Sequence, residues 1–382
     1  MNQTAAFLSV ILKIICVFMG HTIMAQVTMV ITELPNGSAE DEIYISGNFE
    51  KWSGGSEKYK LKKLNGNYRI TLDDSQSEIE FKFTKGTWDS VELNADGSNK
   101  GNRTYSFEKK NDTLEISIER WSDQTASMST AMSNVKILAE DFFMPELNKN
   151  RKIWIFLPSS YENSSQKYPV IYMHDGQNLF DDKLAYGGEW GVDESLNRLS
   201  KEKKLDFIVI GIENGGAERI SEYSPWDLSK YNAKAEGEAY VNFIIETLKP
   251  YVDHNYRTLS DRNSTAIMGS SLGGIISHYA ALKHPEIFGK SVVFSPSFSL
   301  YPQCLDFTEE HARIKNSKMY FMAGDQESAN MVNDMNTIVE VMLNAGFPKT
   351  NIKSKIVVGG EHNESLWKNE FQNAITWLYL SD

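Results

Sequence analysis

The sequence predicts an α/β fold, with a mostly parallel sheet covered by helices on both faces, preceded by a small all-β sandwich. Three observations favour this prediction. From residue 134 to 382, short apolar runs alternate with stretches whose apolar residues recur at helical spacing. Residues 26–121 instead carry short alternating runs separated by Asn-Gly and Asp-Gly turn signals. Between the two parts, residues 122–133 are small, polar and free of periodicity, as in a linker.

Length and charge limit the function classes. A chain of 382 residues is too long for one ordinary domain, and its hydrophobic content of 41% can supply two cores. The formal net charge is −12, and no basic run interrupts the sequence. Such a chain is not expected to bind nucleic acid or an anionic membrane surface.

The first 25 residues have the pattern of a secretory signal peptide. A single charged residue, Lys13, precedes an apolar run at 14–19 that is too short to span a bilayer. Ala25 is a small residue suited to a cleavage point, so the mature chain is expected to begin near Gln26. This predicts a secreted or periplasmic protein without stable membrane insertion after cleavage. An uncleaved N-terminal anchor is the alternative.

The predicted sandwich, an immunoglobulin-like module at 26–121, consists of short strands at close spacing. The candidate strands are Ile43–Ile45, Tyr68–Leu72, Ile79–Phe83 and Leu114–Ile118.

Two segments of this module, Ile45–Trp52 and Phe81–Trp88, resemble the glycogen- and starch-binding modules attached to many carbohydrate-active enzymes. The resemblance implies that Trp52 and Trp88 stack on sugar rings and that Lys82 binds a hydroxyl. Flat aromatic faces suit the apolar faces of a sugar ring, while polar groups at the rim take its hydroxyls. The alternative is that both tryptophans complete a small core. Because a linker follows the module, it is expected to bind a polysaccharide apart from the catalytic residues.

The second domain, 134–382, is expected to alternate strands with helices. The candidate strands are Lys152–Leu157, Pro169–Met173, Phe207–Ile212, Ser264–Met268, Ser291–Phe294, Met319–Ala323 and Ile352–Val358. The candidate helices are Asp193–Lys203, Gly237–Val252, Leu272–His284, Asn330–Ala345 and Glu364–Leu378.

A Gly-x-Ser-x-Gly sequence at 269–273 follows one of these strands and opens a helix. This strand-turn-helix context is typical of a nucleophile elbow, which predicts Ser271 as the nucleophile. The cramped turn is expected to leave no room for a Cβ at Gly269 or Gly273. A Ser-Gly turn without a catalytic role is the simpler alternative.

Downstream of this serine, the sequence offers a carboxylate and a histidine in the chain order of an α/β-hydrolase triad. The strand 319–323 runs into a turn that contains Asp325 and Glu327. The strand 352–358 runs into a glycine-rich turn that ends at His362. We therefore expect His362 to be the general base, oriented by one of the two acids.

An oxyanion hole is expected at the end of the strand 170–173, where α/β-hydrolases contribute one backbone N–H. This assigns Gln177 and Leu272 as the two donors, through their backbones. The neighbouring His174 and Asp175 suggest a metal site, but the sequence has no second ligand cluster with suitable spacing. No metal and no cofactor are expected.

Four segments of the second domain together resemble the bacterial esterases of the esterase D, enterochelin esterase and feruloyl or acetyl-xylan esterase group. They are Met173–Asp181, Gly188–Glu194, Arg219–Trp226 and Gly269–Gly274. The resemblance implies an α/β-hydrolase fold and a serine carboxylic-ester hydrolase.

In this group the acid stands three residues after the glycine that ends its strand, which implies Glu327 here. The group often has Asp at that position, so Asp325 stays an alternative. The resemblance further implies removal of an acyl group, feruloyl or acetyl, from a carbohydrate. A siderophore esterase of the enterochelin type is the first alternative, although Arg219 is the only arginine expected near the site. A non-catalytic carbohydrate-binding protein is the second.

Overall fold

A computed structural model describes residues 25–38, 40–74, 77–97, 99–107, 112–124, 129–185, 187–313 and 317–380. The predicted signal peptide, apart from Ala25, lies outside the described residues.

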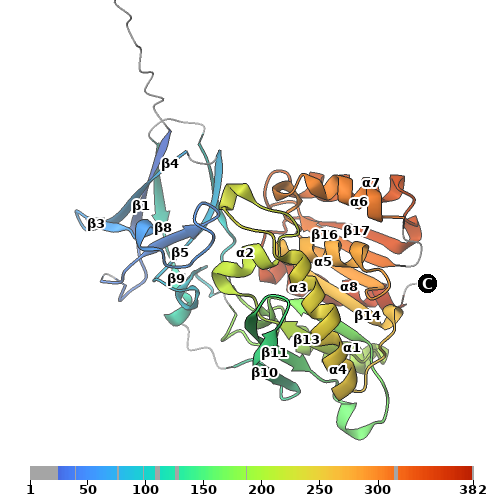
Figure 1. The fold of residues 1–382 in the computed structure, drawn as a ribbon. Coiled ribbons are helices and arrows are strands. Elements are labelled where there is room, and N and C mark those ends of the chain that lie inside the picture. Colours follow the sequence, from blue (N-terminus) through green and yellow to red (C-terminus); the bar gives the residue numbers. More distant parts are fainter. Residues whose placement is uncertain are drawn as a thin grey trace, which may run out of the picture.

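The N-terminal strands, coloured blue to cyan in Figure 1, form two sheets that share one core. One sheet has the order β3-β4-β1-β8 and the other the order β2-β5-β7, with a short β6-β9 pair beside them. The bounds are β1 (Gln26–Glu33), β2 (Tyr44–Gly47), β3 (Lys62–Leu64), β4 (Asn67–Asp73), β5 (Glu78–Thr84), β6 (Glu92–Leu93), β7 (Arg103–Ser106), β8 (Asp112–Ser117) and β9 (Arg120–Trp121). Fully buried Trp121 belongs to this core.

Strand β5 illustrates how the alternation of side chains positions the module. Ile79, Phe81 and Phe83 are buried in the shared core. Because successive side chains of a strand point to opposite faces, Glu80 and Lys82 lie on the other face of β5. That face borders the second domain.

The second domain is built on an eight-stranded sheet within the described part of the chain, with the order β10-β11-β13-β12-β14-β15-β16-β17. The strands from β13 through β12 to β17 run parallel, whereas β10 and β11 pair antiparallel at one edge. The bounds are β10 (Val135–Met144), β11 (Lys149–Phe156), β12 (Val170–His174), β13 (Ile208–Ile212), β14 (Thr265–Ser270), β15 (Lys290–Phe294), β16 (Lys318–Gly324) and β17 (Ile352–Val357). This mixed sheet with its helices is an α/β-hydrolase fold.

Helices cover both faces of this sheet (Figure 1). Helices α1 and α8 pack on one face, and α3 to α7 pack on the other. The bounds are α1 (Val192–Lys203), α2 (Arg219–Glu222), α3 (Gly237–Asn242), α4 (Lys249–Asn255), α5 (Leu272–Lys283), α6 (Gln303–His311), α7 (Met331–Asn344) and α8 (Glu364–Leu380). A π-helical segment, Phe243–Leu248, joins α3 to α4. No helix among the described residues is long and apolar enough to cross a membrane.

The second half of the predicted linker is fixed to the second domain. Ser129 Oγ donates to Asp181 Oδ2 at 2.7 Å, and Thr130 N donates to Asp181 Oδ1 at 3.2 Å. Met132 N donates to Asp193 Oδ2 at 2.8 Å. These bonds anchor the chain where it enters the sheet.

Candidate active site

Ser271 occupies the turn between β14 and α5, with φ 57° and ψ −120°. A positive φ is unusual for a residue with a side chain, and it is the strained conformation that a nucleophile elbow imposes. The turn is close-packed, because a Cβ on Gly269 would lie 2.8 Å from His174 Cδ2 and 2.9 Å from the Gly273 carbonyl carbon. Gly269 is therefore required to be glycine, as the sequence predicts.

The same expectation for Gly273 is wrong. A Cβ there would meet His174 Cβ at 3.4 Å, which is ordinary van der Waals contact. The residue without room for a side chain is Gly274, where a Cβ would lie 2.8 Å from the Phe294 carbonyl oxygen. The close approach is between the first turn of α5 and the end of β15, which the Gly-x-Ser-x-Gly pattern does not describe.

His362 and Glu327 lie in direct contact. The distance between His362 Nδ1 and Glu327 Oε2 is 2.6 Å. The Glu327 side chain is fully buried, and its other oxygen accepts from Ser295 Oγ at 2.8 Å and from Gly324 N at 2.5 Å. These donors fix the carboxylate, which in turn fixes the imidazole.

Asp325 has a different environment. It is exposed, and its Oδ1 accepts from Gly359 N at 2.7 Å, which ties the turn after β16 to the turn after β17. Of the two acids left open by the sequence, Glu327 is the one beside His362.

The environment of His362 favours its charged form. Burial alone would lower the pKa of the imidazole, but the hydrogen bond and negative charge of Glu327 outweigh burial and raise the pKa above its usual value. The ring of Trp367 meets the His362 ring edge-on, with centroids 5.2 Å apart. Trp367 Nε1 donates to Ser295 Oγ at 2.8 Å, so Ser295 links Trp367 to Glu327. The sequence carries no signal for either supporting residue.

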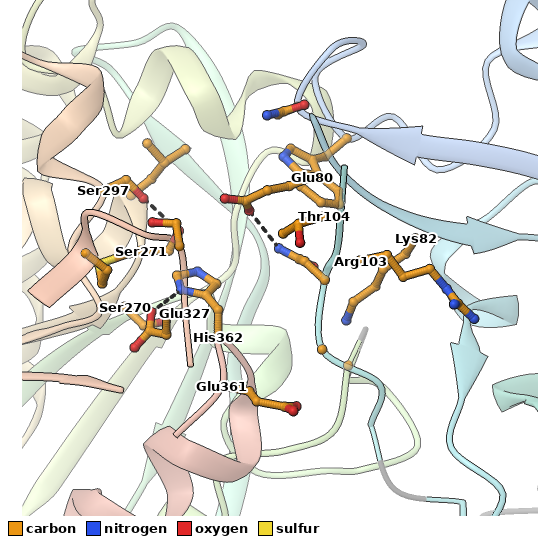
Figure 2. Close-up of a pocket in the computed structure, with 18 of the residues that line it drawn as sticks. Glu80, Lys82, Arg103, Thr104, Ser270, Ser271, Ser297, Glu327, Glu361 and His362 are labelled. Carbon is orange, nitrogen blue, oxygen red and sulfur yellow. Dashed lines mark hydrogen bonds and ion pairs between the residues drawn. The ribbon is translucent and has the colours of Figure 1, made fainter. Parts of the chain in front are cut away.

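The Ser271 hydroxyl lies 3.1 Å from Ser297 Oγ (Figure 2). Among the described residues, the Ser271 hydroxyl is hydrogen-bonded to Ser297 and not to His362. Ser297 comes from the loop after β15 and was not foreseen from the sequence.

The two predicted oxyanion donors lie on neighbouring elements. Leu272 begins α5 and lines the cavity above Ser271. Gln177 lies in the short 3₁₀ turn Gly176–Asn178 after β12, and its side-chain Oε1 accepts from Asn214 N at 3.2 Å. The Gln177 side chain is thus bound to the backbone of Asn214, and the predicted role as an oxyanion donor rests on the Gln177 backbone N–H.

His174 and Asp175 take part in structural contacts. Arg219 binds Asp175 through two bonds, Nε to Oδ1 at 2.6 Å and a terminal nitrogen to Oδ2 at 2.8 Å. His174 Nδ1 lies 2.8 Å from the Tyr240 hydroxyl, and burial lowers the pKa of His174 to about 3. A neutral, buried His174 stabilises the floor beneath the elbow.

A cavity of about 780 Å³ opens above Ser271 and His362, and both domains line it (Figure 2). The second domain contributes, among others, Leu272, Ser297, Leu300 and Met331. The N-terminal module contributes, among others, Trp52, Glu80, Lys82, Trp88, Asn102 and Thr104. The expectation that the module lies apart from the catalytic residues is therefore wrong, because its β5 and β7 form the opposite wall of the same cavity.

Trp52 and Trp88 are half-buried neighbours in that wall. Their ring centroids are 6.0 Å apart at an interplanar angle of 37°, and Trp88 Nε1 donates to the Trp52 carbonyl oxygen at 2.9 Å. The module's core is instead filled by Trp121.

Three carboxylates form a cluster at the start of α1, with ligand atoms within 4.8 Å of one another. They belong to Glu189, Asp193 and Glu194. Lys368 Nζ lies 3.1 Å from Glu189 Oε1, and burial raises the pKa of Asp193 well above its usual range. Together with the bond from Met132 N, these contacts give the cluster a role in anchoring the end of the linker.

Comparisons with known proteins agree with this architecture. The chain is 25% identical over 243 residues to the uncharacterized protein YbbA of Bacillus subtilis, covering 60% of this chain and 93% of that protein. It is 25% identical over 232 residues to the endo-1,4-beta-xylanase/feruloyl esterase of Xylanibacter ruminicola, covering 59% of this chain and 29% of that protein. The solved structure of a ferric enterobactin esterase from Salmonella typhimurium shares the fold, with a TM-score of 0.53, 14% identity and 88% of each chain covered.

The family match covers most of the second domain. The model of the family described as putative esterases matches residues 144–378, which include both Ser271 and His362. That span is more than half of the chain. The protein thus belongs to the putative esterase family and is a carboxylic ester hydrolase.

Proposed function

We propose that this protein is a serine esterase that removes an acyl group, feruloyl or acetyl, from a carbohydrate, with Ser271, His362 and Glu327 as its triad. The observation that carries the proposal is the contact of 2.6 Å between His362 Nδ1 and Glu327, at the cavity into which Ser271 opens. This contact leaves Nε2 of the imidazole as the atom that can exchange a proton with substrate and nucleophile.

In the proposed reaction, Ser271 Oγ attacks the acyl carbon while His362 Nε2 takes the hydroxyl proton. The tetrahedral intermediate then collapses, the bond between the acyl carbon and the alcohol oxygen breaks, and His362 returns the proton to the leaving alcohol. A water molecule attacks the acyl-enzyme in the same way. The acid is released, and the proton returns to Ser271.

Two backbone N–H groups are proposed to stabilise the oxyanion, those of Leu272 and Gln177. Leu272 is the first residue of α5, where the N–H groups of a helix lack intrahelical partners and the helix dipole favours negative charge. Gln177 follows β12, the strand next to β14. Donors fixed in this way are preorganised for the intermediate rather than for the substrate.

The carbohydrate part of the proposal is supported by the charge balance of the cavity. Its described lining has five cationic side chains, Lys51, Lys82, Lys100, Arg103 and Arg219. Six carboxylates balance them, Glu78, Glu80, Asp175, Glu327, Glu361 and Glu364. A neutral, hydroxyl-rich substrate suits such a lining. A relative carrying feruloyl esterase in its name points in the same direction.

A siderophore esterase is the second candidate, since similarity to the enterobactin esterase structure extends over both domains. A catecholate or its ferric complex is anionic and needs uncompensated cations. Here Arg219 is neutralised by Asp175, and Arg103 is bound to the buried carboxylate of Glu92 at 2.7 Å. Both arginines are therefore compensated, which leaves Lys82, unpaired among the described residues, in a lining with six carboxylates, and this balance favours the neutral carbohydrate ester.

We also propose export through the predicted signal peptide. Residue Gln26, the expected start of the mature chain, is the first residue of β1.

The test of the proposed substrate class is a parallel assay of feruloylated and acetylated glycosides, an enterobactin-type trilactone and a small aryl acetate. The carbohydrate esters are expected to give the highest kcat/KM. A higher kcat/KM for the trilactone would reverse the choice between the two candidates.

A further inference from the structure

Lys82 is a buried cation without a partner in the wall of the catalytic cavity. Its side chain is on β5, and only 8% of the residue's surface is exposed. Among the described residues it makes no hydrogen bond and no ion pair, and the carboxylates of Glu364 and Glu92 act on it only through space. Burial lowers the pKa of its ammonium group, as expected for a charge withdrawn from water.

Such an arrangement destabilises the fold. Folded proteins rarely bury a lysine unless its charge is paired, because the desolvation cost is not recovered. The two arginines of the cavity conform to this rule, since Arg219 is bound by Asp175 and Arg103 by Glu92. Lys82 is the exception among these three. Its three N–H donors are available to a molecule that enters the cavity.

The same strand also carries an acceptor in this wall. Glu80 lies two residues earlier on the same face of β5, and its Oε2 accepts from Asn102 Nδ2 at 3.2 Å. Figure 2 shows Glu80 and Lys82 on the module's side of the cavity, across from Ser271 and His362. The negative charge of Glu80 is close enough to raise the pKa of His362.

The module is held against the catalytic loops beside this wall. A Cβ on Gly101 would lie 3.0 Å from Glu361 Oε2, next to the catalytic histidine. A Cβ on Gly188 would lie only 1.8 Å from Asn99 Nδ2, so the Asn99 side chain rests directly on Gly188. These close approaches hold the module next to the segments around Gly188 and Glu361.

The chemistry of the wall fits the alcohol part of the ester. An ammonium group and a carboxylate in the same wall can donate to one hydroxyl and accept from another, as the several hydroxyls of a sugar require. Trp52 and Trp88 in the same wall offer aromatic faces to the ring. The more apolar second-domain wall, with Leu272, Leu300 and Met331, is left for the acyl group.

We propose that β5 and β7 of the N-terminal module form the leaving-group subsite of the esterase, in which Lys82 and Glu80 bind hydroxyls of the same sugar. This inference rests on the proposed function and assigns the module a direct part in substrate selection, rather than in attachment to a polysaccharide alone.

The test compares Lys82→Met with wild type on two substrates, an acylated methyl glycoside and 4-nitrophenyl acetate, which has no sugar. Loss of a charged hydrogen bond to substrate is expected to lower kcat/KM for the glycoside at least about tenfold more than for the aryl acetate. The melting temperature is expected to stay equal or to rise, because an unpaired buried charge is removed. Lys62→Met, at an exposed position of β3, is the matched control. It should change neither the ratio of kcat/KM for the glycoside to kcat/KM for the aryl acetate nor the melting temperature.

The outcomes separate the two proposals. Equal losses of kcat/KM on both substrates, or a lowered melting temperature with an unchanged ratio, would assign Lys82 a structural role and overturn the subsite. Wild-type protein that cleaves the aryl acetate but no acylated glycoside would overturn the proposed substrate class, and the subsite with it. A Glu80→Gln variant that shows the same selective loss, with Glu115→Gln on β8 as its exposed control, would support the paired arrangement.

Discussion

Glu327 is one methylene group longer than the Asp that the resemblance to bacterial esterases also allows at this position, and its carboxylate lies 2.6 Å from His362 Nδ1. The longer side chain remains fixed because Ser295 and Gly324 donate to its second oxygen. A carboxylate held in this way can orient the imidazole and stabilise its cation as the proton is transferred.

We predict that Glu327→Gln lowers kcat by on the order of 10³ to 10⁴-fold, because the imidazole loses its orientation and the stabilisation of its charged form. The pH profile should change as well. His362 must be neutral to act as a base, so kcat/KM falls as the pH drops through its pKa. Since Glu327 raises that pKa, its neutralisation should move the acid limb of the kcat/KM profile to lower pH.

Asp325→Asn is the matched control. Asp325 is exposed, and the contact of its carboxylate with another element, among the described residues, is the bond from Gly359 N in the turn after β17. It should keep kcat and the acid limb near wild type. A large loss of kcat in Asp325→Asn together with a nearly unchanged kcat in Glu327→Gln would contradict the assignment of Glu327 as the acid.

The sequence could nominate Ser271, His362 and two candidate acids because each follows a recognisable strand and turn. It could not nominate Ser295, Ser297 or Trp367. These side chains reach the proposed triad only through folding of distant segments, and no local pattern marks them.

At the scale of elements, the elbow depends on how closely α5 approaches β15. A Cβ on Gly274 would lie 2.8 Å from the Phe294 carbonyl oxygen and 3.4 Å from Pro296, which are backbone and ring atoms with little freedom to move. A Cβ on Gly273 would make only ordinary van der Waals contacts. Local spacing of glycines therefore gave the wrong second glycine.

We predict that Gly274→Ala lowers the free energy of unfolding by about 1–3 kcal/mol through overpacking, and that Gly273→Ala changes it by less than about 1 kcal/mol. Urea denaturation of the two variants measures the difference. Larger destabilisation by Gly273→Ala than by Gly274→Ala would show that the packing at the elbow has been wrongly described.

Most strands of the second domain were predictable, because parallel strands buried on both faces read as continuous apolar runs. Strand β10, Val135–Met144, was missed. It lies at the edge of the sheet, exposes Ile137 and Phe143, and shifts register twice against β11, so that its alternation is broken. The predicted helix 237–252 was found as α3, a π-helical segment and α4, a change that apolar spacing cannot reveal.

At the scale of the whole molecule, the sequence suggested a module, a linker and a catalytic domain, but not their arrangement. The second half of the linker is anchored to Asp181 and Asp193. The module contacts the catalytic loops through small polar contacts, such as Asn99 on Gly188 and Gly101 beside Glu361. Contacts of this kind have no periodicity, so the shared cavity could be found only in three dimensions.

The central claim, catalysis through Ser271, is tested most directly by kcat for a small aryl acetate in two adjacent serine variants. Ser271→Ala should lose on the order of 10⁴ to 10⁶-fold, because the acyl-enzyme cannot form. Ser270→Ala, which removes the hydroxyl of the preceding residue, should keep most of the activity at an unchanged melting temperature. Full activity in Ser271→Ala, or equal losses in both folded variants, would contradict the account.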